Sequence, residues 1–340
     1  MTSRCSAVLW ASLITLTACG GGGGGESNPS TPVVTPTPAD TTLTLLITDA
    51  PVDSASEVVV QFSGVAIKPA DSEEQVFEFD EAKSIDLLAL QGSNSAVLLD
   101  EQTIDPGDYE WIRLAVNAEL GVRDSYMVTD GQEIELRIPS GSQTGLKLVS
   151  GFTVATGGAA DFTIDFDVRK SITNPPGLPE AILKPALRLV NNQEVGAITG
   201  EIAPEIISES CAAEASFAGA VYLYEGADIA ATDLGHVDAE ENVVDPFTTA
   251  LVKFEETEDG STAYNYEFGF IAPGDYSLAF TCSNDDPEND EREVYSTGTL
   301  DPPAEEGEPI ITFYGNSGTS YSVTVTADVV ANQNFELPTP

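Results

Sequence analysis

Apolar and polar residues alternate along much of the chain from residue 43 onward, with the two-residue period of β-strands. The pattern is strictest from Asp161 to Val168, where every second side chain is apolar. We expect these apolar residues to face a core, and Asp161, Asp165 and Asp167 to lie on a solvated strand face. One ion shared by the three aspartates is the alternative. The other predicted strands are rich in apolar and β-branched residues: Leu43–Ile47, Glu57–Ile67, Trp111–Val116, Glu133–Ile138, Gly145–Val154, Ile198–Ile202, Gly219–Tyr224, Tyr264–Phe270, Tyr276–Cys282, Ile310–Tyr314 and Ser320–Ala327.

Short strands at this density are typical of β-sandwiches and barrels, so the sequence predicts an all-β fold. In the first half of the chain only the segment near Ser84–Leu90 favours a helical turn. The length suggests two domains, which we place at residues 43–192 and 196–338.

A short motif occurs twice, as Ile104–Tyr109 and as Ile271–Tyr276. In both copies Pro-Gly favours a tight turn, and the tyrosine begins an apolar strand. The turn resembles one that is common in immunoglobulin-like and transthyretin-like sandwiches. This resemblance implies two related β-sandwich domains of that kind.

The first residues have the anatomy of an export signal. Arg4 precedes an apolar run from Ala7 to Thr17, which is shorter than the roughly 20 residues of a transmembrane helix. The run ends in Leu-Thr-Ala-Cys at residues 16–19, which resembles the lipobox of bacterial lipoproteins. The resemblance implies a signal peptide at residues 1–18 and acyl chains on Cys19, and several such chains hold a protein stably at a membrane. An ordinary secretory signal followed by a chance cysteine is the alternative.

A tether is predicted to follow the anchor, at residues 19–42. It begins with Gly20–Gly25 and continues as a Ser/Thr/Pro-rich stretch, and neither part buries apolar surface, so we expect disorder. Similar lipoproteins that stay in the inner membrane tend to carry Asp after the lipidated cysteine, where this chain has Gly20. The outer membrane is therefore favoured, and its periplasmic and cell-surface faces both stay open.

Residues 43–190 resemble the bacterial domain of unknown function family 4382. The resemblance implies a β-rich domain of exported lipoproteins with no established activity, often followed by a second β-sandwich. The acidic, cysteine-bearing second domain departs from it. The matching stretches run in order along the domain: Leu45–Asp53, Ile85–Leu88, Pro106–Tyr109 with Ile112–Leu114, Pro139–Gly141 with Gly145–Lys147, Asp165–Asp167 and Leu183–Arg188.

The chain is strongly acidic, with a formal net charge of −43. The charge is uneven, because residues 196–340 hold 29 acidic and 2 basic residues. Nucleic acids and anionic headgroups need clustered Lys and Arg, so this surface argues against both as partners. Solubility in a salty habitat explains the charge, and binding of divalent cations is the alternative.

Two cysteines remain outside the signal and the anchor, Cys211 and Cys282. In an exported protein a disulfide is their natural pairing, and closure of a loop of about 70 residues would stabilise the domain by roughly 4 kcal/mol. Two buried free thiols are the alternative.

No motif in the sequence indicates an enzyme. His236 is the only histidine and lies in an acidic segment, Ser140 lies in a Pro-Ser-Gly turn, and no Gly-x-Ser-x-Gly motif is present. One histidine and two paired cysteines do not furnish the usual zinc ligands. Paired carboxylates for glycoside hydrolysis arise by chance among 56 acidic residues, so a carboxylate-dependent hydrolase is the weakest hypothesis.

Calcium is the best candidate among cofactors, because it takes six to eight oxygen ligands from carboxylates and carbonyls. The densest acidic cluster contains Asp285, Asp286, Glu288 and Asp290, but it lacks the Asp-x-Asp-x-Asp-Gly pattern and is more readily interpreted as a mobile loop. Asp49 and Asp53 flank Pro51, where side-chain capping of the turn is favoured over metal binding.

The sequence thus predicts a lipid-anchored, non-enzymatic envelope protein that displays β-sandwich domains for binding, adhesion or structure. Its expected partners are the membrane, through the lipid, and an unidentified protein or carbohydrate. A calcium-dependent recognition module is the alternative.

Overall fold

The computed structural model describes residues 40–50, 55–129, 131–138, 145–173, 179–184, 186–210, 219–231, 244–257, 260–282, 313–314 and 321–337. Residues Pro38–Pro340 form one compact unit. The predicted signal peptide and nearly all of the predicted tether lie outside the described residues.

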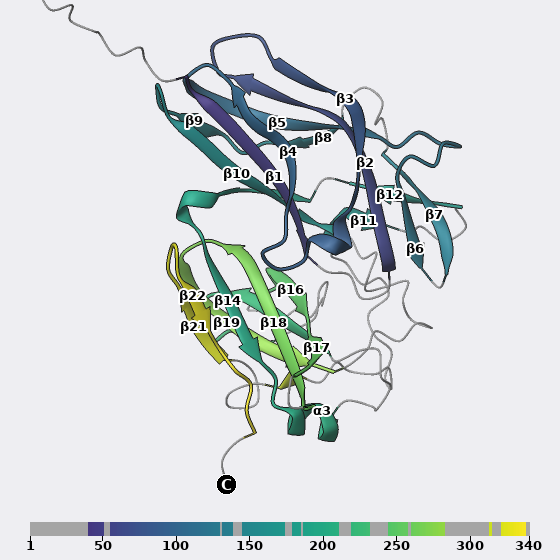
Figure 1. The fold of residues 1–340 in the computed structure, drawn as a ribbon, viewed down its shortest axis with the longest axis vertical. Coiled ribbons are helices and arrows are strands. Elements are labelled where there is room, and N and C mark those ends of the chain that lie inside the picture. The colour runs from purple at the N-terminus through teal and green to yellow at the C-terminus, as the bar shows by residue number, and fades with distance from the viewer. Residues whose placement is uncertain are drawn as a thin grey trace, which may run out of the picture. The chain divides into compact units, whose positions relative to one another are not determined.

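The first part of the chain forms two sheets around one apolar core (Figure 1). The first sheet contains, in order, β13 (Leu187–Asn191), β10 (Ala159–Asp167), β1 (Thr42–Ala50) and β4 (Ala96–Thr103). β1 runs parallel to β10 and antiparallel to β4. Leu43, Leu45 and Ile47 of β1 are fully buried in the core between the sheets.

The second sheet is centred on the long strand β2. It contains, in order, β11 (Ile172–Thr173), β12 (Glu180–Leu183), β7 (Gln132–Arg137), β6 (Tyr126–Thr129), β2 (Ala55–Pro69), β5 (Gly107–Asn117) and β8 (Leu146–Leu148). Two more strands extend it, β3 (Gln75–Asp86) on β2 and β9 (Phe152–Val154) on β5.

Three short helical elements connect these strands, and an Asp or Asn side chain caps each one. They are η1 (Leu87–Leu90), α2 (Val168–Ser171) and η2 (Asn192–Glu194), capped by Asp86, Asp167 and Asn191. The helical turn predicted near Ser84–Leu90 is therefore confirmed as η1, but the expectation that it is the only one there is wrong, because α2 forms as well. The strand predicted to end at Val168 ends one residue earlier, because the Asp167 side chain caps α2.

The later part of the chain forms two further sheets. One contains β17 (Lys253–Glu256), β18 (Thr262–Ile271), β14 (Gly196–Glu201) and β22 (Val330–Asn332). The other contains β16 (Thr248–Leu251), β15 (Ala220–Glu225), β19 (Gly274–Thr281) and β20 (Phe313–Tyr314), with β21 (Tyr321–Val325) also on β19. A short helix, α3 (Pro204–Ser210), follows β14.

Buried apolar side chains of the described residues gather in two main cores, one within residues 43–183 and one within residues 198–335. A smaller cluster around Tyr222 and Tyr224 lies on the opposite face of β15. The all-β prediction is confirmed. The two cores are compatible with the predicted domains, whose boundaries stay predictions.

One predicted strand, Gly145–Val154, is divided in the structure into β8 and β9. Both pieces pair with β5, but Ile112 lies opposite Leu148 whereas Tyr109 lies opposite Phe152. The register therefore shifts by one residue between them, and a single regular strand does not fit both pairings.

The repeated sequence motif forms the same corner twice. The Tyr109 hydroxyl donates to the Asp105 carbonyl at 2.6 Å, and the Tyr276 hydroxyl donates to the Ala272 carbonyl at 2.9 Å. In each copy the hydroxyl thus reaches the carbonyl four residues upstream. Burial raises the pKa of both phenols, and so do the nearby charges of Asp105 and Glu225, so both hydroxyls remain donors.

The aspartate that precedes each tyrosine also accepts the same kind of hydrogen bond in both copies. Asp108 accepts a hydrogen bond from Thr153 of β9 at 2.6 Å, and Asp275 accepts one from Thr324 of β21 at 2.7 Å. Both pairs are directly opposed across antiparallel strands. The two corners therefore share their hydrogen bonds as well as their sequence.

We predict that Tyr109→Phe and Tyr276→Phe each lower the free energy of unfolding by about 1 kcal/mol, because each removes one buried hydrogen bond. Urea denaturation of the full chain measures the change. Tyr321→Phe is the matched control, since its hydroxyl lies 3.4 Å from the Glu336 carbonyl and makes a much weaker bond. Losses no larger than that of the control would show that the corners contribute little.

Candidate functional site

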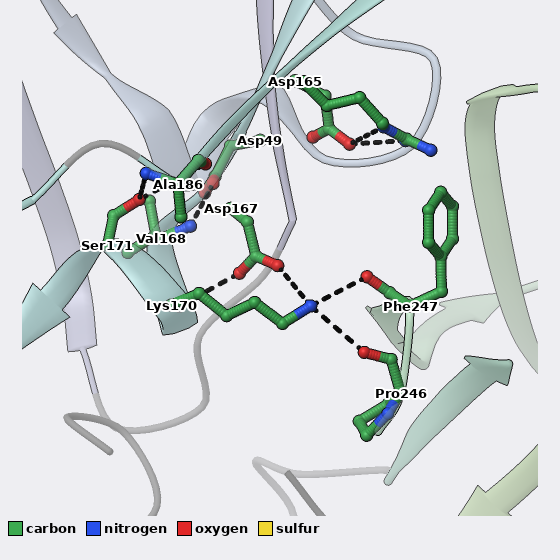
Figure 2. Close-up of polar contacts among 10 residues, drawn as sticks. Asp49, Asp165, Asp167, Val168, Lys170, Ser171, Ala186, Pro246 and Phe247 are labelled. Atoms are coloured by element: carbon green, nitrogen blue, oxygen red, sulfur yellow. Dashed lines mark hydrogen bonds and ion pairs between the residues drawn. The ribbon is translucent and has the colours of Figure 1, made fainter. Parts of the chain in front are cut away.

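A cluster of charged side chains lies where β10 ends and α2 begins (Figure 2). Asp165 and Arg188 are register partners on β10 and β13, and the Arg188 Nε and Nη2 atoms lie 3.2 and 2.5 Å from the same Asp165 carboxylate oxygen. The two side chains are 14% and 29% exposed, so water screens this ion pair only weakly.

The second ion pair of this cluster reaches toward the later part of the chain. Lys170 Nζ lies 2.9 Å from Asp167 Oδ2 and donates to the carbonyls of Pro246 and Phe247 at 3.1 Å each. Figure 2 shows the lysine extended between these partners. The Arg188 guanidinium lies 4.1 Å from the centre of the Phe247 ring, a cation–π contact. Both basic side chains thus hold the 246–247 segment.

Asp49 joins the start of α2 to β1. It is buried in β1, and its Oδ1 accepts a hydrogen bond from the backbone of Val168 at 3.2 Å. The parallel pairing of β1 with β10 brings this carboxylate to the start of α2. The predicted capping of the turn around Pro51 stays a prediction, because residues 51–54 are not described. Asp53 lies outside the described residues.

The prediction that β10 has a solvated face is wrong. Thr163 is fully buried, and Asp165 is largely covered by Arg188. Burial raises the pKa of Asp165, and the Arg188 charge opposes that rise. The alternation itself is confirmed, since Phe162, Ile164 and Phe166 face the core.

The three aspartates of β10 each have a separate partner. Asp161 accepts from Asn192 Nδ2 at 2.8 Å, while Asp165 pairs with Arg188 and Asp167 with Lys170. Among the described residues no group of three or more His, Cys, Asp or Glu side chains is placed to hold a metal ion. The arrangement instead suits the mutual fixing of backbone segments.

A polar cavity of about 500 Å³ lies over the sheet of β17, β18, β14 and β22. Its lining combines amide, carboxylate, hydroxyl and ammonium groups, and it includes Asn265, Glu267, Glu201, Lys253, Asn332 and Asn334. Asn265 lies opposite both Glu201 and Lys253, and Thr199 lies opposite both Glu267 and Asn332. The floor of the cavity is therefore two adjacent rows of polar side chains on one sheet face.

Backbone contacts hold this floor in place. The Asn334 side chain accepts a hydrogen bond from the Glu201 backbone at 3.0 Å, and the Tyr266 hydroxyl donates to the Gln333 carbonyl at 2.5 Å. Burial raises the pKa of the Tyr266 phenol strongly, so it stays protonated and keeps donating. These contacts fix the edge segment after β22 against β14.

A loop between η1 and β4 forms one wall of the cavity through Gln91 and Gly92. The Ser93 hydroxyl donates to Glu267, and the Thr48 hydroxyl contacts the carbonyls of Leu90 and Asn94 at 2.8 Å each. The loop is thus fixed at both of its ends.

The sequence analysis missed this cavity. The available signal was the alternation of polar residues in Thr199–Glu201, Lys253–Glu255 and Asn265–Glu267, together with the wholly polar segment Asn332–Asn334. Such alternation indicates a polar strand face, but it does not say which strands lie side by side.

Most of the predicted site residues lie outside the described part of the chain. These are the lipidation residue Cys19, the calcium candidates Asp285, Asp286, Glu288 and Asp290, and also Cys211, His236 and Ser140. Cys282 is described and is disulfide-bonded, whereas Cys211 is not described, so their pairing with each other stays a prediction. Calcium binding stays a prediction too.

Comparison with known protein families bears on the first part of the chain. Residues 40–185 match the family described as "Domain of unknown function (DUF4382)". The resemblance seen in the sequence is confirmed over these residues, which include Asp165 and Asp167 of the charged cluster. No curated protein matches the chain.

Several solved structures are only distantly similar. A "putative cell adhesion protein" from Bacteroides fragilis is 10% identical and aligns over 88% of this chain and 92% of its own, with a TM-score of 0.20. One of the same description from Bacteroides eggerthii is 9% identical over 88% of each chain, with a TM-score of 0.19. The major pilin of Streptococcus pyogenes is 10% identical over 88% of this chain and all of its own, with a TM-score of 0.14. TM-scores this low carry no argument about fold or function.

Proposed function

We propose that this protein is a lipid-anchored, non-enzymatic lipoprotein of the bacterial cell envelope that displays β-sandwich domains for binding, adhesion or structure. The observation that carries the proposal is the Leu-Thr-Ala-Cys motif at residues 16–19, which ends an apolar run and precedes six glycines. Acylation of Cys19 would attach the chain, and Gly20 favours the outer membrane. Within the described residues no helix is long and apolar enough to cross a membrane.

The architecture supports a display role. Rigid sheets with buried cores follow the predicted tether, and the two tyrosine corners and the charged cluster add fixed contacts to them. The segment that matches DUF4382 and the acidic sheets that follow it would then be presented away from the bilayer. A single histidine and the lack of a nucleophile motif in the sequence favour binding over catalysis.

The anchor is tested by expressing the full chain in a Gram-negative host with labelled palmitate. We expect the wild type to incorporate label and to sediment with membranes, and Cys19→Ala to lose all label. Cys5→Ala is the matched control, because Cys5 lies within the predicted signal peptide and should not affect acylation. Label that persists in Cys19→Ala, or wild-type protein without label, would refute the proposed anchor.

A further inference from the structure

The polar cavity over β17, β18, β14 and β22 has the chemistry of a binding site for a ligand rich in hydroxyl groups. Four amide side chains line it, from Gln91, Asn265, Asn332 and Asn334. An amide group both donates and accepts hydrogen bonds, as a hydroxyl group does. The carboxylates in the lining add acceptors, and Lys253 adds a donor.

The charge of the lining excludes several ligand classes. Glu201, Glu255 and Glu267 outnumber Lys253, so the cavity repels phosphates, sulfates and acidic sugars. Among the described side chains no three His, Cys, Asp or Glu residues are placed together to hold a divalent cation. An apolar ligand would leave many polar groups without hydrogen bonds, which is costly. A neutral ligand rich in hydroxyl groups avoids the charge repulsion, needs no metal-binding cluster and can form hydrogen bonds with the polar lining.

The geometry suits an extended ligand with repeated groups. Neighbouring strands lie about 4.8 Å apart, and side chains on one face recur about every 6.6 Å along a strand, so the two polar rows form a regular grid. The Asn334 contact with Glu201 and the Ser93 contact with Glu267 hold parts of this grid before a ligand arrives. A preorganised surface loses less entropy on binding.

We propose that this cavity binds a neutral saccharide, with sugar hydroxyls donating to Glu201 and Glu267 and accepting from Asn265, Asn332 and Lys253. The proposal deepens the proposed function, because it names the ligand class of a displayed module. It does not depend on the anchor. Binding is measured on purified protein and acylation in cells, so the failure of one test leaves the other intact.

The test is calorimetric titration of the full chain, purified in detergent, with short linear oligosaccharides of glucose, mannose, galactose and xylose. Oligogalacturonate and chitosan oligomers serve as anionic and cationic counterparts. We expect at least one neutral sugar to bind, and Asn265→Ala/Asn332→Ala to weaken that binding about tenfold, since lost hydrogen bonds of this kind have about that effect.

Glu256→Ala is the matched control, because Glu256 lies on the same strand as Lys253 but is not part of the cavity lining. Its affinity should equal that of the wild type. If the double variant melts earlier, Asn332→Asp, which keeps the side-chain shape but removes both amide donors, provides the same comparison. The proposal is overturned if no neutral sugar binds, if only the cationic oligomer binds, or if the cavity variants bind as well as the wild type.

Discussion

Replacement of Arg188 by leucine is expected to lower the free energy of unfolding by about 3–5 kcal/mol at neutral pH, because it leaves the Asp165 carboxylate buried without its countercharge. The side chain of Asp165 is only 14% exposed, so water replaces the lost guanidinium poorly. The variant also loses the contact between Arg188 and Phe247. Urea denaturation followed by far-ultraviolet circular dichroism measures the loss.

The pH dependence separates these two contributions. Burial raises the pKa of Asp165 above its ordinary value even with Arg188 present, so the folded state binds this proton more tightly than the unfolded state does. The stabilisation that comes from protonated Asp165 is fully present below the ordinary pKa of an aspartate. It is lost as the pH rises through the raised pKa of Asp165 in the folded state. Removing Arg188 raises the pKa of Asp165 further. The deficit of the variant should therefore be small in acid and largest at neutral pH, whereas the loss of the Phe247 contact is independent of the protonation of Asp165.

Two further variants sharpen this test. In Asp165→Asn/Arg188→Leu neither charge of this pair remains, so the double variant should be more stable than Arg188→Leu at neutral pH and its deficit should change little with pH. Arg123→Leu is the exposed control, because Arg123 is 68% exposed in its pair with Glu133 and should cost less than about 1 kcal/mol. An Arg188→Leu deficit that is equal in acid and at neutral pH would contradict this account of the cluster.

Several strands, β10 among them, were predictable because they depend on local alternation, whereas β3 and β4 are not among the predicted strands. From Phe162 to Phe166 the residues that face the apolar core are the alternate ones that the pattern indicates. The contacts that cover the opposite face of β10 were not predictable. Arg188 comes from β13, and Phe247 comes from a segment far along the chain. A local pattern shows that one face of a strand is polar, but only tertiary structure decides whether water or protein covers that face.

The repeated corner was predictable for the same reason, since its turn and its tyrosine lie within six residues. The cavity was not, because its two polar rows depend on strand pairing. Asn332 lies opposite Thr199 only because β22 runs parallel to β14 across a long separation in the sequence. The lipobox is the opposite case, since its chemistry is contained in four consecutive residues and needs no folded partner.

Gly200→Ala is expected to lower the free energy of unfolding by about 3 kcal/mol, at the upper end of the usual cost of overpacking. A β-carbon at this position would lie 1.9 Å from the Gln333 carbonyl oxygen and 2.6 Å from the Tyr266 ring. Neither the Gln333 carbonyl nor the Tyr266 ring can easily move away. The Tyr266 hydroxyl donates to that same carbonyl, and the Gln333 backbone donates to Thr199 at 2.9 Å. The edge segment after β22 must therefore move away from β14.

Gly274→Ala is the matched control, because its β-carbon would meet nothing closer than 3.4 Å and the change should stay within about 1 kcal/mol in either direction. Hydrogen exchange should locate the damage of Gly200→Ala in β14 and β22, with the β2 and β5 amides around the first core unaffected. Because Gly200 also lines the cavity, the same variant should weaken saccharide binding. Equal stability of the two alanine variants would mean that β14 and the edge segment do not approach as closely as described. The close packing that fixes the two polar rows of the cavity floor would then be absent.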